Sequence, residues 1–298
     1  MRSLHSIIGW DACQCPSGLT DTALLQIAYE AISVPLKQIR LIRTDTAVTT
    51  DGGATSASRQ TYISGNAILN ATNSLKEKTI KEASRILGAD GKDLYYQDGQ
   101  IKHKSKPSVS ISIKEVAKRY GRILRGEGHF DPETTRLDPE TGEGSPYATY
   151  AFATHLAEVE VDVETGKVKV NRIVASHDVG KAINPKNVIG QIMGGVTMGV
   201  GMALMEEYVP EKTISFVNYL IPTSKDVPEV ISIIVEDEEP SGPLGAKGVG
   251  EPALIPTAPA ILNAITDAIG ERIYDLPATL ERVREAAEKA KECKAHRE

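Results

Sequence analysis

Apolar and polar residues alternate most regularly between residues 156 and 174. The alternation runs through Leu156–Val163, stops at Glu164–Gly166 and resumes through Lys167–Val174. A period of two is typical of strands with one buried face, and a short turn containing glycine joins such strands into a hairpin. The pattern therefore predicts a β-hairpin over 156–174.

Helical periodicity marks several other segments. Between residues 60 and 87 the apolar positions, among them Ile68, Leu75 and Ile86, recur near every 3.6 residues, and Gly88 follows as a helix-ending residue. We further expect helices over 22–32, 113–120, 185–208, 258–269 and 277–294, a hairpin over 93–101, and strands over 39–42, 214–219 and 230–235. Because strands and helices do not alternate regularly, the pattern favours an α+β fold over a doubly wound sheet.

The segment 126–146 interrupts the periodic pattern. Gly, Pro, Asp, Glu and Thr dominate it, which is typical of a surface loop. The tetrapeptide Asp-Pro-Glu-Thr begins at Asp131 and again at Asp138, but two copies do not indicate a repeat protein. We expect an atypical N-terminus over 1–19, a first subdomain over 20–125, a linker loop over 126–146 and a second subdomain over 147–298.

Composition excludes some classes of protein. The 298 residues carry 34 Lys+Arg against 40 Asp+Glu, a net charge of −6, and 5% aromatic residues. The chain therefore lacks the basic and aromatic surface that nucleic-acid binding needs. Its three cysteines, Cys13, Cys15 and Cys293, cannot supply the four thiolates of a usual iron–sulfur cluster.

The hydropathy of the chain also indicates whether it is exported or inserted into a membrane. Arg2 is not followed by a long apolar run, so no signal peptide is expected. The uncharged stretch from Asn187 to Met205 approaches the length of a membrane span, but it contains five glycines and Gln191. A buried glycine-rich helix is the better interpretation, and we expect a cytoplasmic protein. Glycines at 190/194 and 195/199 lie one turn apart and would let a helix or a ligand approach the backbone.

One carboxylate stands out among glycines. In Gly242–Pro252 four glycines precede Glu251, and Pro252 follows it. Glycines let a ligand approach the backbone closely, and a rigidly held carboxylate beside that ligand suits a general base. The alternative is a turn-rich loop with a surface glutamate.

Four further features have a functional and a structural interpretation. The small residues Gly52–Ser58 precede a helix and suit an anion-binding turn or an ordinary loop. Gln191 is either a buried, satisfied amide or a ligand contact. His177 with Asp178 lacks a partner at metal-ligand spacing, so a structural histidine is favoured. Cys13 and Cys15 alone do not close a metal site and are interpreted as free thiols.

Taken together in order, these segments resemble the molybdenum hydroxylases, the xanthine dehydrogenase/aldehyde oxidoreductase family. The similarity covers about residues 20–286 and corresponds to the C-terminal half of the molybdopterin-binding large subunit. Its motifs are Asp51–Ala67 (DGGATSASRQTYISGNA), Gly126–Asp131 (GEGHFD), His177–Pro185 (HDVGKAINP), Gly190–Gly201 (GQIMGGVTMGVG) and Gly245–Pro252 (GAKGVGEP). The resemblance implies two mixed α+β subdomains that bind a molybdenum–molybdopterin cofactor, whose cytosine dinucleotide form is one alternative.

The resemblance also implies individual roles. Glu251 would be the general base beside the metal, in the water-derived hydroxylation of an aldehyde or an N-heteroaromatic substrate. The remaining cofactor-binding residues would be Ala57, Ser58, Arg59, Gln60, Gln191, Gly248, Val249 and Gly250. No side chain of the chain is expected to ligate the metal.

Two departures from the family pattern determine which partner subunits we expect. The family's N-terminal half of the subunit is absent, and Asp11–Gly18 replaces a glycine–glutamine–glycine loop. We therefore expect the N-terminal half as a separate polypeptide, an iron–sulfur subunit carrying the clusters and a subunit carrying FAD. The alternative is a truncated, non-catalytic fragment or assembly module that does not bind the cofactor alone.

Overall fold

The computed structural model describes residues 6–9, 18–42, 45, 47, 49, 52, 55–121 and 123–295. The expectations for Cys13 and Cys15, and for Asp51, Gly53 and Ala54 of the small-residue loop, lie outside the described residues. The chain divides into two compact units. Unit 1 comprises Met1–Tyr150 and Glu238–Gly248, and unit 2 comprises Ala151–Asp237 and Val249–Glu298.

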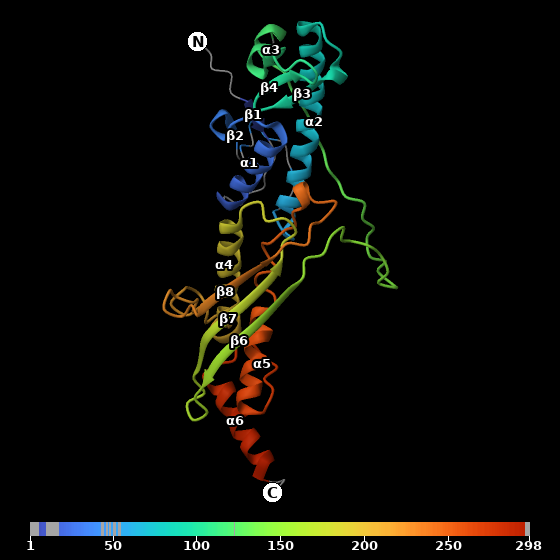
Figure 1. Cartoon of the computed structure of the whole chain (residues 1–298). Helices are drawn as coiled ribbons and strands as arrows, with labels where there is room; N and C mark the ends of the chain where they lie inside the picture. Colours follow the sequence, from blue (N-terminus) through green and yellow to red (C-terminus); the bar gives the residue numbers. More distant parts are fainter. Residues whose placement is uncertain are drawn as a thin grey trace. The chain divides into compact units, whose positions relative to one another are not determined.

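Unit 1 is built on one long helix. Its elements are β1 (Ser6–Gly9), α1 (Gly18–Ile32), η1 (Leu36–Gln38), β2 (Ile39–Ile42), α2 (Arg59–Leu87), η2 (Gly91–Asp93), β3 (Leu94–Gln97), β4 (Gln100–His103), β5 (Ser110–Ser112), α3 (Ile113–Tyr120) and η3 (Pro243–Gly245). β1 pairs with β2 in parallel, and β3–β4–β5 form an antiparallel sheet. α1 packs against α2, and the far end of α2 shares a buried apolar cluster with the β3–β5 sheet and α3 (Figure 1).

The first part of the expected linker loop packs along α2. A Cβ atom added at Gly126 or Gly128 would overlap the backbone of Ala71, so only glycine allows this approach. Asn70 Nδ2 donates to the carbonyl oxygen of His129 at 2.8 Å. The ring of Phe130 meets that of Tyr62 edge to face, with 5.5 Å between centroids. The GEGHF motif therefore holds the chain against α2.

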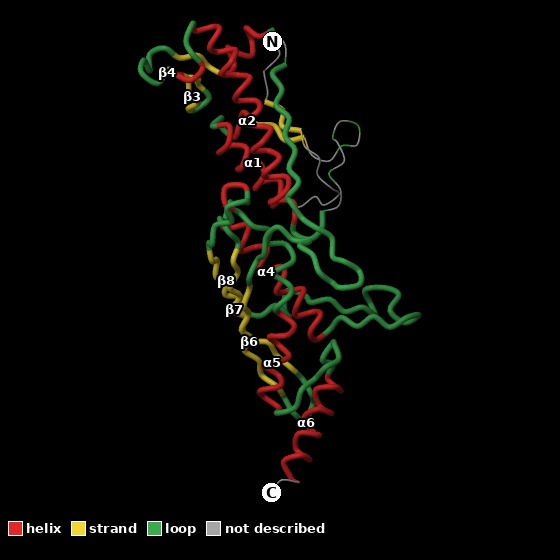
Figure 2. Tube along the Cα trace, turned by 90° about the vertical axis from the view of Figure 1, so that its right-hand side faces the viewer, coloured by secondary structure: helices red, strands yellow, loops and turns green. Residues whose placement is uncertain are grey.

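Unit 2 is a three-stranded sheet covered by helices. Its elements are β6 (Ala153–Val161), β7 (Val168–Asp178), α4 (Pro185–Leu204), β8 (Glu229–Val235), α5 (Thr257–Ile269) and α6 (Leu280–Ala295). β6 and β7 form the expected antiparallel hairpin, and β8 joins β7 in parallel. Figure 2 shows α4 and α5 on one side of these strands. The apolar core lies between them and includes Ile173, Ile192, Val196, Ile261 and Ile265, all completely buried.

The glycine-rich stretch forms the helix α4. Asn184 caps it by accepting a hydrogen bond from the backbone N–H of Asn187, and Pro185 occupies the first turn, where no N–H is needed. By length and composition α4 could cross a membrane. In this structure it contacts β7, β8 and α5, and Ile192, Val196 and Val200 are buried in the core of unit 2. Separate small sheets combined with helices confirm the expected α+β class.

Two details differ from the sequence expectations. The segment 214–219 forms turns rather than a strand, because the carbonyl oxygen of Ser215 accepts hydrogen bonds from the backbone N–H groups of Asn218 and Tyr219. Glu238–Gly248 belongs to unit 1, whereas the sequence placed it with residues 147–298. Pro243 packs on Gly65 of α2, where an added Cβ atom would lie 2.6 Å from Pro243 Cγ.

Candidate functional site

In unit 1 a strained turn leads into α2. Ala57 and Ser58 both have left-handed backbone conformations, with φ of 54° and 52°. This conformation costs a non-glycine residue roughly 1–2 kcal/mol, so the surrounding structure must hold it in place. Ser58 is the N-cap of α2, whose first turn carries a partial positive charge. The N–H of Arg59 donates to the carbonyl oxygen of Ser56 at 3.2 Å, which closes the turn at the start of the helix.

The two residues after this turn have different surroundings. Arg59 is partly exposed, and its Nη1 donates to the carbonyl oxygen of Gly52 at 2.8 Å. Gln60 is buried, its Nε2 donates to Thr55 Oγ1 at 2.9 Å, and its Oε1 accepts from Ser64 Oγ at 2.7 Å. Gln60 thus supports the turn from inside, whereas Arg59 keeps a cation near the surface.

The segment that ends at Gly248 is fixed to the same helix. Ser241 shares a 2.8 Å hydrogen bond with the Tyr62 hydroxyl, and its carbonyl oxygen accepts from Asn66 Nδ2 at 2.8 Å. Hydrogen bonds from Ser241 lower the pKa of Glu239 below its usual range, with smaller contributions from Thr149 and Lys247. A Cβ atom at Gly248 would collide with the carbonyl oxygen of Ser58. Two segments that the sequence singled out separately are therefore in direct contact.

In unit 2 the chain after Gly248 forms a turn that is anchored on α4. Gly195 lies against Ala253, and a Cβ atom added there would be 2.6 Å from Ala253 Cβ. One helical turn later, Gly199 lies against the side chain of Thr257. The Val249 side chain packs on the core, whereas Gly250 and Glu251 are exposed. The glutamate is thus presented at the surface of unit 2 by a turn fixed at two points.

Gln191 lies on the same stripe of α4 as these two glycines. Residues 191, 195 and 199 are four apart, so their positions follow one another along one face of the helix. Gly195 meets Ala253 and Gly199 meets Thr257, so this stripe is the side of α4 that packs on the segment after Glu251. A Cβ atom at Gly190 or Gly194 would meet nothing within 4 Å, so this neighbouring face is open.

A pair of histidines under this turn was not expected from the sequence. His155 of β6 and His177 of β7 lie on the inner sheet face, with 2.7 Å between their Nε2 atoms. His155 Nδ1 is 3.0 Å from the hydroxyl of Thr257, the first residue of α5. His177 is 1% exposed. The sequence identified His177 alone, because its partner His155 is 22 positions away and Thr257, which bonds His155, is 80 positions away.

Burial makes the histidine pair a source of pH-dependent stability. Burial, with the neighbouring His177, lowers the pKa of His155 to about 4, and burial also lowers the pKa of His177. The unfolded chain binds protons at these residues near pH 6.5, whereas the folded chain does not. We expect the free energy of unfolding to be highest above about pH 6.5 and to fall as the pH decreases toward 4.

Urea unfolding at pH 7.5, 6.5, 5.5 and 4.5 measures this dependence. The variant His155→Gln should show a smaller decrease over the same range, because it removes one of the two titrating groups. A stability that is constant or rises toward pH 4.5 would contradict the assignment of neutral, buried rings.

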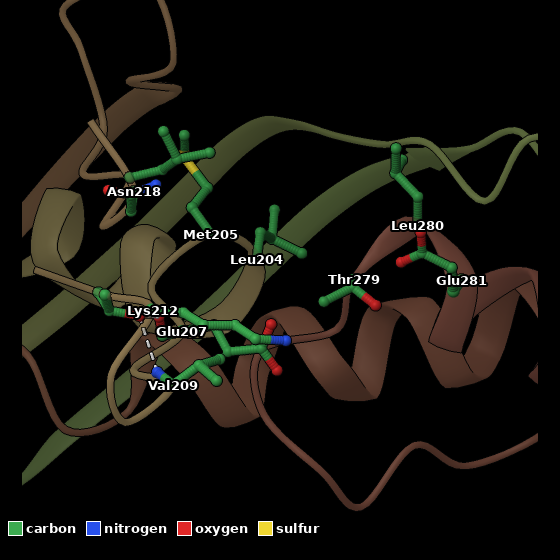
Figure 3. Close-up of a pocket in the computed structure, with 11 residues that line it drawn as sticks. Leu204, Met205, Glu207, Val209, Lys212, Asn218, Thr279, Leu280 and Glu281 are labelled. Atoms are coloured by element: carbon green, nitrogen blue, oxygen red, sulfur yellow. Dashed lines mark hydrogen bonds between the residues drawn. The ribbon is translucent and has the colours of Figure 1, made fainter. Parts of the chain in front are cut away.

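A separate cavity lies at the other end of α4. It has a volume of about 470 Å³ and is lined by residues of the 204–220 segment together with Thr279, Leu280 and Glu281 (Figure 3). A hydrogen bond from the Val209 N–H to Thr213 Oγ1, 2.8 Å long, closes one wall. Leu204 is 13 residues from Gln191, which corresponds to roughly 20 Å along a helix. None of the residues that the sequence singled out lines this cavity.

Known proteins share this architecture. A sequence model of the molybdopterin cofactor-binding domain matches residues 18–228. The gamma subunit of the 6-hydroxypseudooxynicotine dehydrogenase complex of Paenarthrobacter nicotinovorans is 33% identical, over 88% of this chain and 34% of its own length. The xanthine dehydrogenase molybdenum-binding subunit of Escherichia coli O157:H7 is 34% identical, over 89% of this chain and 35% of its own.

A solved structure agrees with these sequence matches. The aldehyde oxidoreductase from Desulfovibrio desulfuricans ATCC 27774 superposes with a TM-score of 0.74 and 34% identity, over 89% of this chain and 27% of that one. The chain thus spans about a third of the length of the relatives that it matches. It belongs to the molybdopterin cofactor-binding domain family and corresponds to part of the large subunit of the xanthine dehydrogenase/aldehyde oxidoreductase family.

Proposed function

We propose that the chain is the C-terminal, molybdopterin-binding portion of a molybdenum hydroxylase and that it is active in a complex. The observation that carries this proposal is the arrangement of the Glu251 turn. The exposed Glu251 lies two residues before Ala253, which packs on the α4 stripe that bears Gln191. A general base requires this combination of access to solvent or substrate and fixed position.

The residues present fit an anionic pterin cofactor. The left-handed turn at Ala57 and Ser58, followed by Arg59 at the N-terminus of α2, would bind phosphate through backbone dipoles and a cation. The Gln191 amide would hydrogen-bond the cofactor, and Gly248, Val249 and Gly250 would approach it through their backbone. Gln60 would act indirectly, by supporting the turn.

When bound, the cofactor supplies the redox centre that takes up electrons from the substrate. Glu251 would accept the proton that is released as the water-derived oxygen is activated, because its carboxylate is held at a fixed position on the turn. We propose an N-heteroaromatic compound or an aldehyde as substrate, and a cofactor that includes the cytosine dinucleotide form among its alternatives.

Electrons would leave through iron–sulfur clusters and FAD on partner subunits in the cytoplasm. Cys293 is an exposed free thiol, and the described residues contain no group of three or more His, Cys, Asp or Glu side chains that could hold a metal ion. Because the three cysteines of the whole chain are fewer than the four thiolates of a usual iron–sulfur cluster, we propose that the clusters belong to other polypeptides.

One exposed, apolar face of α4 is suited to bind a partner polypeptide. Met193, Met198 and Met202 are 44%, 58% and 43% exposed, and they flank the open glycines Gly190 and Gly194. Methionine side chains adapt to irregular partner surfaces, and an exposed apolar patch marks an interaction site. Since the chain spans about a third of its relatives, we propose that the remaining part of the large subunit covers this face.

A charge on this face is expected to prevent assembly. In co-expression with the remaining part of the large subunit, Met198→Lys should lower the recovered complex at least tenfold, because a buried ammonium without a partner is costly. The control Ala268→Lys places the same charge on the exposed side of α5. Equal recovery of both variants, measured by affinity purification, would show that the α4 face is not the contact.

The second candidate function is a non-catalytic fragment or assembly module. It is favoured by the sequence Asp11–Gly18, which stands in place of the family's glycine–glutamine–glycine loop. Purification with native partners, followed by a screen of aldehydes and N-heterocycles, separates the two. Oxidation of a member of either substrate class supports the enzyme, whereas a stable, fully assembled complex without any such activity supports the module.

A further inference from the structure

Thr257 connects the sheet, α4 and the Glu251 turn within unit 2. The residue is completely buried, and its methyl group lies against Gly199, where an added Cβ atom would be 2.8 Å from Thr257 Cγ2. Its hydroxyl is 3.0 Å from His155 Nδ1. Although Thr257 begins α5, its hydroxyl makes this contact with the sheet, and the N-cap position is occupied by Pro256, which forms no side-chain cap.

The histidine pair gives this hydroxyl a fixed partner. Because both rings are neutral near pH 7, the 2.7 Å contact between their Nε2 atoms requires one hydrogen between them. The position of that hydrogen sets the tautomer of His155, and therefore decides whether Nδ1 donates to Thr257 Oγ1 or accepts from it. The two rings also meet edge to face, with 4.9 Å between their centroids. This packing limits the rotation of both rings.

Backbone hydrogen bonds continue the connection from Thr257 to Glu251. The N–H of Thr257 donates to the carbonyl oxygen of Leu254 at 3.2 Å, and the N–H of Leu254 donates to the carbonyl oxygen of Glu251 at 3.0 Å. Ala253, between them, is completely buried against Gly195. A shift of Thr257 would therefore move the backbone that carries the Glu251 carboxylate.

We propose that Thr257 is a positioning residue, whose hydroxyl, bonded to the His155 ring that His177 orients, fixes the Glu251 turn relative to α4. The inference rests on the proposed function of Glu251. Its physical basis is that the α4 contacts fix how closely the turn approaches the helix, whereas the directional hydrogen bond to the sheet fixes its orientation. A misplacement of about 1 Å at a reacting group lowers turnover by ~10²-fold, even without loss of the group itself.

Two substitutions at one position separate the hydroxyl from the shape of the side chain. Thr257→Val keeps the branched shape and removes the hydrogen bond, whereas Thr257→Ser keeps the hydroxyl and removes the methyl group. Hydrogen exchange is measured on the full 298-residue chain, at the amides of Leu254 and Thr257. Turnover, KM and molybdenum content are measured on the assembled complex.

We expect Thr257→Val to accelerate exchange at both amides about tenfold, while exchange in the β3–β4 hairpin of unit 1 is unchanged. The turnover per molybdenum should fall ~10–100-fold with KM nearly constant, since the base is displaced while the rest of the site is intact. Thr257→Ser should keep exchange and turnover close to those of the unchanged chain.

The inference is overturned if Thr257→Val leaves exchange and turnover unchanged, or if Thr257→Ser impairs both as strongly as Thr257→Val. Should Thr257→Val not be recoverable, His155→Leu and His155→Gln test the same hydrogen bond from the sheet. His155→Leu should reproduce the loss, and His155→Gln, whose amide can bond Thr257, should restore most of it. A complex of the unchanged chain without molybdenum would count against the proposed function, whereas the exchange comparison would still decide this inference.

Discussion

Replacing Glu251 by glutamine is expected to lower the turnover of the assembled enzyme by ~10²–10⁴-fold, the range typical of a lost general base. Glutamine keeps the size of the side chain but cannot accept a proton at neutral pH. Because Glu251 is exposed on a turn fixed by Ala253 and Thr257, the substitution should leave the fold and the cofactor content unchanged. The measurement is turnover per bound molybdenum, which separates chemistry from loading.

A matched control removes another carboxylate from the same unit. Glu160→Gln alters an exposed residue on β6, and its turnover should equal that of the unchanged enzyme. If Glu251→Gln retained near wild-type turnover per molybdenum, the assignment of the base would be wrong. A parallel loss of molybdenum would instead indicate that Glu251 contributes to cofactor retention.

The adjacent glycines Gly194 and Gly195 are expected to respond in opposite directions to alanine. At Gly194 an added Cβ atom meets open space, so Gly194→Ala should stabilise the isolated chain by about 0.5–1 kcal/mol through helix propensity. At Gly195 the Cβ atom would lie 2.6 Å from Ala253 Cβ and 2.7 Å from the Ala253 carbonyl carbon. Gly195→Ala should destabilise the chain by about 1–3 kcal/mol, the usual cost of overpacking.

Urea unfolding of both variants measures this difference. In the assembled enzyme, Gly195→Ala should also lower turnover, because the turn that carries Glu251 must move away from α4. Gly194→Ala should lower assembly or cofactor loading, because its face is the one we propose to be covered. Equal stability of the two variants would show that the Ala253 contact adapts without cost.

Local patterning was enough to predict most elements of the fold. The alternation over 156–174 corresponds to β6 and β7, and the helix expected over 113–120 is α3. These elements are predictable because one buried face imposes a period on the sequence. The prediction of a strand over 214–219 was wrong, because this segment has no buried face. Its apolar residues Ile214, Phe216 and Val217 are more than three-quarters exposed, so no buried face imposed the pattern there.

The glycine pairs of α4 show what the spacing of residues can and cannot predict. Both 190/194 and 195/199 are one turn apart, so the sequence indicated two faces open to close approach without distinguishing them. The structure distinguishes them, because Gly195 and Gly199 contact the turn after Glu251, whereas Gly190 and Gly194 face open space. That difference arises from tertiary packing of residues more than 50 positions apart.

The residues that support the candidate site could not be predicted from the sequence. His155 and Thr257 are 102 residues apart, and each alone is an unremarkable polar residue in an apolar segment. The contact of Gly248 with Ser58 likewise joins segments 190 positions apart. The resemblance to a family identified Glu251 and the Ser58 turn. The contacts that support each of them join residues far apart in the chain, within unit 2 for Glu251 and within unit 1 for the Ser58 turn.

We propose that this chain binds the molybdopterin cofactor as part of a larger enzyme. The most direct measurement is the molybdenum and pterin content of the chain purified together with the remaining part of the large subunit and its redox partners. We expect about one molybdenum and one pterin per chain. A correctly assembled complex that contains neither, after expression in cells able to make the cofactor, would contradict it.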